Sequence, residues 1–133
     1  MNEDFIPFEL AVKLKEKGFD IPFYFFYRSD DKLIHHAMVG KPLVYCDEID
    51  DEVVCAPTIP QVLKWLREEK KIVICIFPHP CGWQADIYKD VHQYYDSEAE
   101  CYLMHYYKEK TEISHSYNWL EIYCIQYVLD NLI

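Results

Sequence analysis

The chain has 133 residues, 51% of them hydrophobic and 17% aromatic, and a formal net charge of −10. This composition excludes a disordered protein, which has few aromatic residues and low hydrophobicity, and the length suffices for one domain with its own core. We therefore expect a single domain over residues 1–133. Nucleic acid is not an expected partner because affinity for phosphates comes from Lys and Arg, whereas a basic protein surface is compatible with the charge.

The sequence favours a cytoplasmic location. No apolar run approaches the ~20 residues that span a bilayer, so we expect no membrane association. The acidic start, Met1 to Phe5, lacks the basic and apolar regions of a signal peptide. The six cysteines are therefore expected to be reduced and mostly buried as small hydrophobic side chains.

The first half of the chain predicts one helix and three strands. Apolar residues at helical spacing indicate a helix from Pro7 to Lys17, which Gly18 ends. The strands are expected at residues 23–27, 33–39 and 43–46. An acidic loop, Asp47 to Glu52, follows; it lacks the glycine and the spaced oxygen ligands of an EF-hand.

The second helix has the clearest start signal. Thr58 and Gln61 form a capping-box pattern, in which each side chain bonds the other residue's backbone N–H. The continuous apolar run from Ile72 to Phe77 is expected to be a central strand. Residues 78–82 form a predicted turn, and residues 83–88 return as the partner strand of a hairpin.

Two further elements close the chain. Residues 97–110 are compatible with a helix or with an aromatic strand from Cys101 to Tyr107, and we favour the strand. A last helix is expected from Tyr117 to Leu132, capped by Ser114 or Ser116. Its wide apolar arc predicts deep burial, within the domain or against another subunit. The elements together predict an α+β fold with three helices on an antiparallel or mixed sheet, roughly in the order α-β-β-β-α-β-β-(β)-α.

Several motifs of known enzyme classes are missing. The only glycines are Gly18, Gly40 and Gly82, which form neither a dinucleotide-binding fingerprint nor a P-loop. The chain also lacks the Gly-x-Ser-x-Gly elbow of serine hydrolases. We expect no cofactor, and we assign the many aromatic side chains to core packing first. The sequence identifies no catalytic residue.

The candidate ligand-binding residues are His79, Cys81 and Trp83, in the predicted hairpin. An imidazole beside a thiol is able to activate that thiol as a thiolate, although a proline-rich turn explains the same residues without chemistry. No metal site is expected, because no Cys-x-x-Cys pair occurs. His35 and His36 are adjacent on a predicted strand and face opposite sides, so they do not bind one metal together.

Two stretches of the chain have a distinctive pattern. The first is Phe8, Ala11 and Leu14-Lys15-Glu16 with Gly18-Phe19-Asp20 and Pro22, and the second is Ala56-Pro57-Thr58 with Gln61 and Trp65-Leu66-Arg67-Glu68. In these stretches the chain resembles a family of short uncharacterised proteins from anaerobic gut bacteria, their phages and mobile elements. The resemblance implies an α+β domain, a bacterial or phage cytoplasm and an accessory role, and it implies no activity.

Three functional hypotheses follow from the sequence. The first is a non-enzymatic protein-interaction domain that forms a homodimer through the C-terminal helix or binds a basic protein. The second is a small enzyme or ligand-binding domain centred on residues 79–83. The third, weaker hypothesis is an acidic protein that mimics DNA and occupies a basic host protein.

Overall fold

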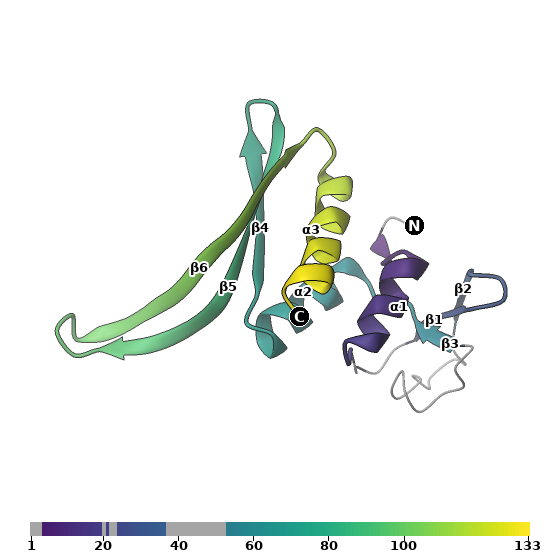
Figure 1. The fold of residues 1–133 in the computed structure, drawn as a ribbon, viewed down its shortest axis with the longest axis horizontal. Helices are drawn as coiled ribbons and strands as arrows, with labels where there is room; N and C mark the ends of the chain where they lie inside the picture. The colour runs from purple at the N-terminus through teal and green to yellow at the C-terminus, as the bar shows by residue number, and fades with distance from the viewer. Residues whose placement is uncertain (1–3, 20, 22–23, 37–52) are drawn as a thin grey trace. The chain divides into compact units, whose positions relative to one another are not determined.

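The computed structural model of the chain describes residues 4–19, 21, 24–36 and 53–133 (Figure 1). Its elements follow the order α-β-β-β-α-β-β-β-α, which confirms the predicted α+β fold. The structure divides into two compact units. The first runs from the N-terminus to Val62 and includes Leu129–Ile133, and the second comprises Leu63–Val128. The expectation of a single domain stays a prediction.

The first unit contains a small antiparallel sheet with the strand order β2-β1-β3. The strands are β1 (Phe25–Arg28), β2 (Ile34–His36) and β3 (Val53–Cys55). The first two confirm predicted strands, but β3 was not predicted, and the expected strand at residues 43–46 lies outside the described residues. All three residues of β3 are buried, so this strand has no alternating pattern that would mark it in the sequence.

Helix α1 (Phe8–Glu16) belongs to the same unit and begins and ends close to the predicted bounds. Its buried face consists of Leu10, Ala11 and Leu14. At its end Gly18 adopts φ +86°, a conformation that residues with a Cβ seldom take. This turn brings the N–H of Phe19 to the carbonyl oxygen of Leu14 at 3.0 Å, which confirms the predicted glycine stop.

Helix α2 (Ile59–Glu69) starts with the predicted capping box. The backbone N–H of Thr58 donates to Gln61 Oε1 at 2.9 Å, and the N–H of Gln61 approaches Thr58 Oγ1 at 3.4 Å. Val62 and Leu66 are fully buried on one side of the helix. Val62 and Leu66, four residues apart, therefore lie on the buried face of α2.

The second unit is built on an antiparallel sheet with the order β4-β5-β6. Its strands are β4 (Val73–His79), β5 (Gly82–Asp96) and β6 (Cys101–Ser114). The prediction that the apolar run at 72–77 is a central strand was wrong, because β4 lies at the edge and β5 at the centre. A continuous apolar run marks a hydrophobic strand but does not give its place in the sheet. The favoured strand interpretation of residues 97–110 is confirmed, since β6 starts at Cys101 after a turn.

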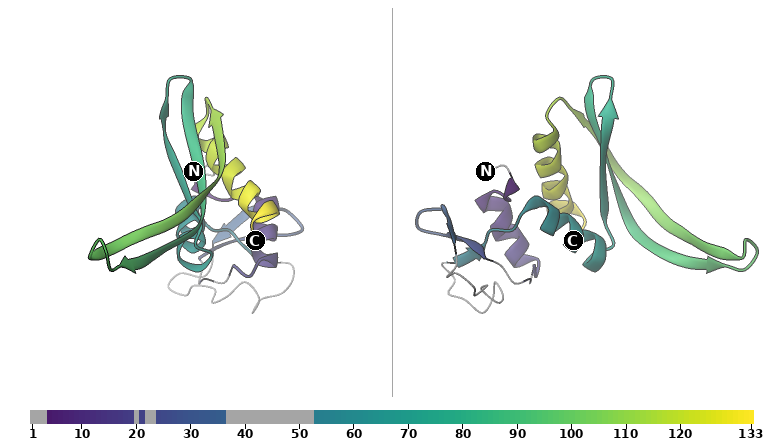
Figure 2. Two further views of the ribbon diagram at one scale, coloured as in Figure 1. Left: turned by 60° about the vertical axis from the view of Figure 1, so that its left-hand side comes forward. Right: turned by 180° about the vertical axis from the view of Figure 1, so that it is seen from behind.

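Helix α3 (Tyr117–Asn131) packs on one face of this sheet. The ring of Tyr117 meets Trp83 edge-on at 5.0 Å between centroids, and Lys110 Nζ lies 5.6 Å from the ring centroid of Tyr127. On β5, Ala85 and Ile87 share the face of Trp83 and are buried. Figure 2 shows the helix beside these strands in both views.

The N-terminal cap and the apolar arc of α3 agree with the prediction. Ser116 Oγ accepts the N–H of Trp119 at 3.1 Å. Within the arc, Leu120, Cys124 and Val128 have no exposed surface. The arc is thus buried within the chain, which is the first of the two options that its width predicted.

The cysteines are less buried than expected. Five fall among the described residues, and all five are free thiols. Cys55 and Cys124 are buried, but Cys75, Cys81 and Cys101 are exposed, so the expectation of mostly buried thiols was wrong. No helix among the described residues is long and apolar enough to cross a membrane.

Candidate functional site on the β5–β6 hairpin

The two long strands of the second unit continue past the rest of their sheet. Strand β4 begins at Val73, which pairs with Tyr88 of β5. Beyond Tyr88, β5 pairs on one side with β6, and on the other side the backbone N–H of Val91 donates to Lys71 O. We call residues 89–107 the hairpin arm. Figure 1 shows the arm as two strands that curve away from β4 and α3 to a tip at the left.

Two irregularities in the strand pairing shape the arm. The register shifts between Ile87 and Tyr88 and again between Lys89 and His92. Asp90, within the second shift, has φ +53°. Extra residues of this kind bend a strand pair and increase its twist. They therefore account for the direction in which the arm leaves the sheet.

One face of the arm is lined by tyrosines. Tyr88 contacts Tyr106 at 5.1 Å between ring centroids, and Tyr95 contacts Tyr102 at 5.2 Å. Met104 lies between Tyr102 and Tyr106 on the same side of β6. We call these five residues the tyrosine face; four of them lie in the arm, and Tyr88 directly precedes it. Tyr102 is 65% exposed and Met104 54%, so the surface is apolar but open to solvent.

The opposite face of the arm carries a histidine pair. His92 and His105 are cross-strand partners whose ring centroids lie 4.8 Å apart, and Tyr107 meets His105 edge-on at 4.7 Å. His92 Nδ1 donates to the carbonyl oxygen of Asp90 at 2.9 Å. Both faces of the arm are therefore covered with rings.

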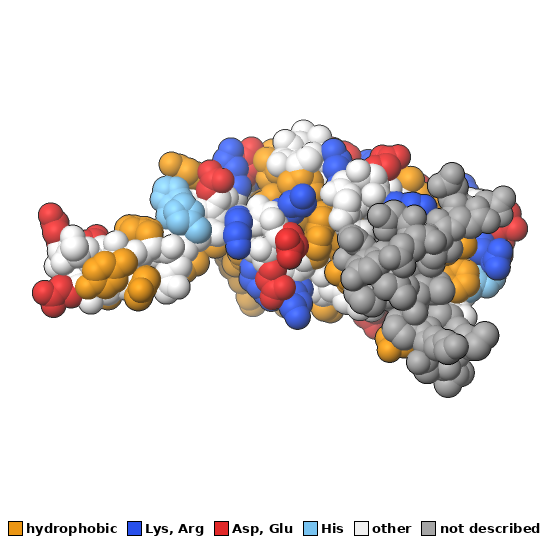
Figure 3. Space-filling view, turned by 90° about the horizontal axis from the view of Figure 1, so that it is seen from below, with side chains coloured by type: hydrophobic (Ala, Val, Ile, Leu, Met, Phe, Trp, Pro, Cys, Tyr) orange, Lys and Arg blue, Asp and Glu red, His pale blue; other side chains and the backbone are white. Residues whose placement is uncertain are grey.

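The charged side chains between Lys89 and Lys108 are all acidic. Between Lys89 and Lys108 the chain has no Lys or Arg, and its four charged residues are Asp90, Asp96, Glu98 and Glu100. Asp96 Oδ1 accepts the N–H groups of Glu98 and Ala99 at 2.9 and 3.2 Å, which orders the turn at the tip. Figure 3 shows the result at its left: carboxylates at the tip, hydrophobic side chains behind them, and the pale blue histidines further in.

An apolar groove lies at the root of the tyrosine face. Its volume is about 400 Å³. Strands β4, β5 and β6 all line it, through Val73, Cys75, Tyr88, Val91, Met104 and Tyr106. Since two of the exposed side chains of the arm, Met104 and Tyr106, also line this groove, the arm and the groove form one continuous apolar surface.

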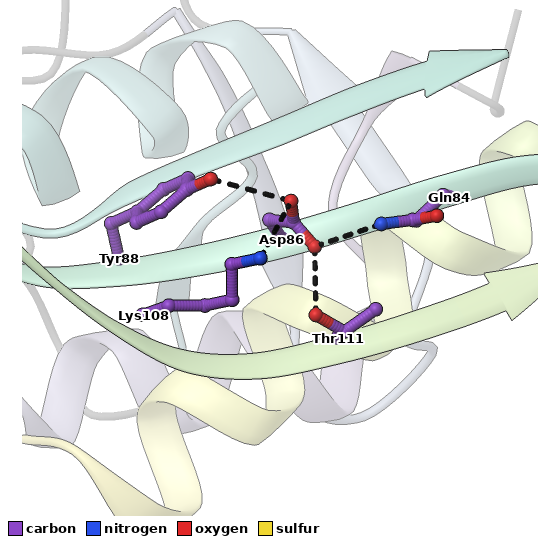
Figure 4. Close-up of polar contacts among 5 residues, drawn as sticks. All are labelled: Gln84, Asp86, Tyr88, Lys108 and Thr111. Atoms are coloured by element: carbon purple, nitrogen blue, oxygen red, sulfur yellow. Dashed lines mark hydrogen bonds and ion pairs between the residues drawn. The ribbon is translucent and has the colours of Figure 1, made fainter.

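A buried carboxylate lies beside the groove (Figure 4). Asp86 is only 4% exposed, and its oxygens accept hydrogen bonds from Thr111 Oγ1 at 2.8 Å, Gln84 Nε2 at 3.2 Å and Tyr88 OH at 3.3 Å. Lys108 Nζ lies 3.7 Å from the carboxylate. The cluster fixes the ring of Tyr88, which is part of the tyrosine face.

The cluster also sets the ionisation of its members. Burial alone raises the pKa of Asp86, but the bonds from Thr111, Gln84 and Tyr88 and the charge of Lys108 outweigh it, so the net pKa is lowered. Asp86 is therefore ionised at neutral pH. The pKa of Tyr88 is raised by burial and by the neighbouring Asp86, and the pKa of Cys75 is raised by the same two causes. Tyr88 and Cys75 are thus neutral at that pH, which disfavours thiolate chemistry at Cys75.

The predicted site residues are at the other end of β4 and β5. His79 and Gly82 pair at the end of the β4–β5 hairpin, and His79 Nδ1 accepts the backbone N–H of Cys81 at 3.0 Å. The Cys81 side chain is exposed, and Trp83 packs on Tyr117. The structure thus places all three residues on one hairpin, where the imidazole closes the turn. Their role in ligand binding stays a prediction.

Sequence reasoning missed the arm because it assigned the aromatic side chains to the core. Among the described residues seven tyrosines are exposed: Tyr24, Tyr94, Tyr95, Tyr102, Tyr106, Tyr107 and Tyr117. One signal in the sequence is the stretch from Cys101 to Tyr107, in which three tyrosines stand without any charged residue. Its neighbours on both sides are charged, which marks the stretch as a distinct surface.

A second groove lies in the first unit. It has a volume of about 490 Å³ and is lined by Phe5, Pro7, Phe8, Tyr27, Lys32, Leu33 and Ile34. Lys32 Nζ lies 5.5 Å from the ring centroid of Phe8. His35 and His36 lie nearby on β2 and contact different rings, Phe26 and Phe25, as expected for opposite faces of a strand.

The described residues contain no group of three or more His, Cys, Asp or Glu side chains that could hold a metal ion. A scan against protein-family models, a search of curated proteins and a search of solved structures each return no match for the chain. The class that the fold defines is an α+β protein, and any function is therefore argued from the surface itself.

Proposed function

We propose that this chain is a non-enzymatic protein-interaction domain whose docking surface is the tyrosine face of the hairpin arm. The observation that carries the proposal is the group of exposed Tyr and Met side chains on this face, Tyr95, Tyr102, Met104 and Tyr106. Contiguous exposed apolar surface marks interaction sites on proteins. Tyr and Met are also enriched at protein interfaces, where a ring supplies a large contact area at low entropic cost.

The proposed partner is a basic protein surface. The arm has four carboxylates and no Lys or Arg between Lys89 and Lys108. An Arg of the partner would stack on an exposed tyrosine ring and pair with a carboxylate of the arm at the same time. The net charge of −10 speeds the encounter with a basic partner and opposes nucleic acid.

A peptide selection tests this proposal. A library of displayed peptides is selected on the wild-type chain and on a triple variant, Tyr95→Ala/Tyr102→Ala/Tyr106→Ala. We expect the wild type to enrich Arg- and Lys-rich sequences. In fluorescence anisotropy, the affinity of a selected peptide should fall more than about tenfold in the triple variant, because hot-spot rings each contribute about 1–2 kcal/mol or more.

The matched control is Tyr24→Ala, which removes an exposed ring from the first unit. This variant should bind the selected peptide as the wild type does. Equal affinity for the triple variant and the wild type, or enrichment of acidic peptides, would refute the proposal.

The other hypotheses have less support. The apolar arc of α3 is buried within the chain, so self-association through the C-terminal helix would rely on the exposed side chains of Tyr117 and Trp119. A ligand site at residues 79–83 competes with the hydrogen bond between His79 and Cys81. DNA mimicry rests on net charge alone. A bacterial or phage cytoplasm, suggested by the resemblance to gut-bacterial proteins, remains part of the proposal.

A further inference from the structure

The histidine pair lies on the face of the arm that the proposed function does not use. His92 and His105 stand directly across from each other on β5 and β6, and their ring centroids are 4.8 Å apart. His92 is exposed and His105 is half-buried, so packing into a core does not account for the pair. Figure 3 shows the pale blue histidine side chains of the arm at the surface.

The hydrogen bond of His92 leaves one ring nitrogen able to bind a metal ion. A carbonyl oxygen only accepts, so the bond from Nδ1 to Asp90 O at 2.9 Å places the proton of neutral His92 on Nδ1. The lone pair is then on Nε2. Histidines that bind metal ions commonly donate their other ring N–H to a carbonyl or carboxylate oxygen, which fixes the tautomer and orients the ring. The bond to Asp90 O supports His92 in this way.

His105 supplies a second ring nitrogen. Its ring contacts are with His92 and, edge-on at 4.7 Å between centroids, with Tyr107. Among the described residues no hydrogen bond occupies its ring nitrogens. Since a neutral imidazole has one nitrogen with a lone pair, His105 also has a donor atom available for a metal ion.

The spacing of the two rings suits one shared ion. With metal–nitrogen bonds of about 2.0–2.1 Å and angles of about 90–110° at the ion, two imidazole centroids lie about 4.5–5.5 Å apart. The observed 4.8 Å falls within this range. Once one imidazole binds the ion, the other is an intramolecular ligand at high effective concentration. The cross-strand pairing therefore holds the two rings at the distance that a chelate requires.

The charges around the pair favour a cation. The charged side chains between Lys89 and Lys108 are all carboxylates, and the charge of Lys89 itself is offset by Glu109 at 3.0 Å. A divalent cation is therefore attracted to the arm. No third ligating side chain of the described residues joins the two histidines, so water would fill the remaining positions of the ion, as it does at open metal sites.

We infer that His92 and His105 together bind one divalent transition-metal ion of the class of Zn²⁺, Cu²⁺ and Ni²⁺. Imidazole nitrogen suits these ions, whereas Mg²⁺ prefers oxygen ligands. The bound ion links β5 to β6 through side chains and stabilises the hairpin arm by mass action. This inference goes beyond the proposed function and does not depend on it, because the pair lies on the face opposite the tyrosine face.

Titration of the untagged full chain with Zn²⁺ tests the site. Isothermal titration calorimetry compares the wild type with His92→Phe and His105→Phe, which keep an aromatic pair across the strands but remove one ligating nitrogen. We expect one Zn²⁺ per chain to depend on the pair, and binding at least about tenfold weaker in each variant, because a chelate becomes a single ligand. Mg²⁺ should not compete for the site.

His35→Phe is the matched control. It replaces an imidazole that stacks on a neighbouring aromatic ring, Phe26, in the first unit, and it should bind Zn²⁺ as the wild type does. All of these variants keep every cysteine, so binding by thiols is the same in each. Circular dichroism and thermal melting check that the variants are folded.

Nitrogen chemical shifts identify the atoms that bind the ion. In long-range ¹H–¹⁵N spectra of the imidazoles, Zn²⁺ should shift Nε2 of His92 and leave Nδ1 protonated. Coordination through Nδ1 of His92 would contradict the inference. So would equal Zn²⁺ binding by the wild type and both phenylalanine variants, or no saturable binding to the wild type below about 1 mM.

The same variants separate this inference from the proposed function. The triple tyrosine variant should bind Zn²⁺ as the wild type does, and His92→Phe should bind the selected basic peptide as the wild type does. Failure of the metal site therefore leaves the peptide result standing, and failure of peptide binding leaves the metal result standing.

Discussion

Strands β5 and β6 have two halves of different character. In the base, Ala85 and Ile87 are buried on the face where α3 packs. In the arm, the large side chains of Tyr95, Tyr102 and Met104 are exposed. The comparison teaches that hydrophobic residues on a strand identify a surface to be covered. In the base this surface is covered by α3, and in the function proposed above a partner protein covers it in the arm.

The polar groups differ between the halves as well. The base contains a carboxylate, Asp86, whose hydrogen bonds to Gln84, Tyr88 and Thr111 are all made within the same sheet. The carboxylates of the arm are Asp90, Asp96, Glu98 and Glu100, which lie at its ends rather than within a network. We interpret the base as the part that holds the fold, and in the function proposed above the arm is the part that meets a partner.

The largest expected effect is a difference in how much the base and the arm contribute to the free energy of unfolding. Leu120→Ala in α3 removes a fully buried side chain and should lower the free energy of unfolding by about 2–5 kcal/mol. Met104→Ala in the arm should lower it by about 0.5 kcal/mol or less, because that side chain is 54% exposed. Urea denaturation measures both values. A similar loss for the two variants would mean that the arm belongs to the core and is not a free surface.

Much of the fold followed from local signals in the sequence. The capping box at Thr58 and the glycine after α1 each provide hydrogen bonds for main-chain groups at a helix end. Because these interactions join residues that are close in the sequence, a short stretch of sequence is enough to predict them. The edge position of β4 and the arm were missed because they depend on the distant strands that pair with a segment. Alternation and hydrophobicity do not report such partners.

The candidate site shows the same limit. We selected His79, Cys81 and Trp83 as candidates because of the chemistry of their side chains. In the structure, however, the His79 ring accepts a hydrogen bond from the backbone N–H of Cys81 in its own turn. The tyrosine face is made of residues that are common in cores. Only the geometry of β6, which runs on with β5 beyond the start of β4, shows that its rings are outside.

The next effect concerns Gly82, where the base of the hairpin meets the end of β6. A Cβ at Gly82 would lie 2.6 Å from Ser114 O, and the residue has φ +135°. We expect Gly82→Ala to cost about 2–3 kcal/mol, from a clash with main chain as well as backbone strain.

Gly18 provides the matched control for this substitution. Its φ of +86° is also unfavourable for alanine, but a Cβ there meets nothing within 4 Å. Gly18→Ala should cost about 1 kcal/mol from backbone conformation alone. Equal losses of unfolding free energy for the two variants in urea denaturation would show that the close approach to Ser114 adds no cost, because the end of β6 shifts to accommodate the Cβ.

The smallest effect tests whether the base depends on an ionised Asp86. The pKa of this carboxyl is lowered in the folded chain, because burial is outweighed by its hydrogen bonds and by Lys108. Because the pKa is lower in the folded chain, the carboxylate stabilises the fold at pH values above the pKa that Asp86 has in the unfolded chain. This contribution is lost as the pH falls through the pKa that Asp86 has in the folded chain.

Asp86→Asn should therefore lower the free energy of unfolding by about 1–2 kcal/mol at pH 7. The gap between the two proteins should narrow in urea denaturation as the pH falls from about 5 toward 2, below the ordinary pKa of Asp. A gap that stays constant over this range would show that the substitution acts through shape and hydrogen-bond geometry, and not through the charge that accepts the hydrogen bond of the Tyr88 hydroxyl.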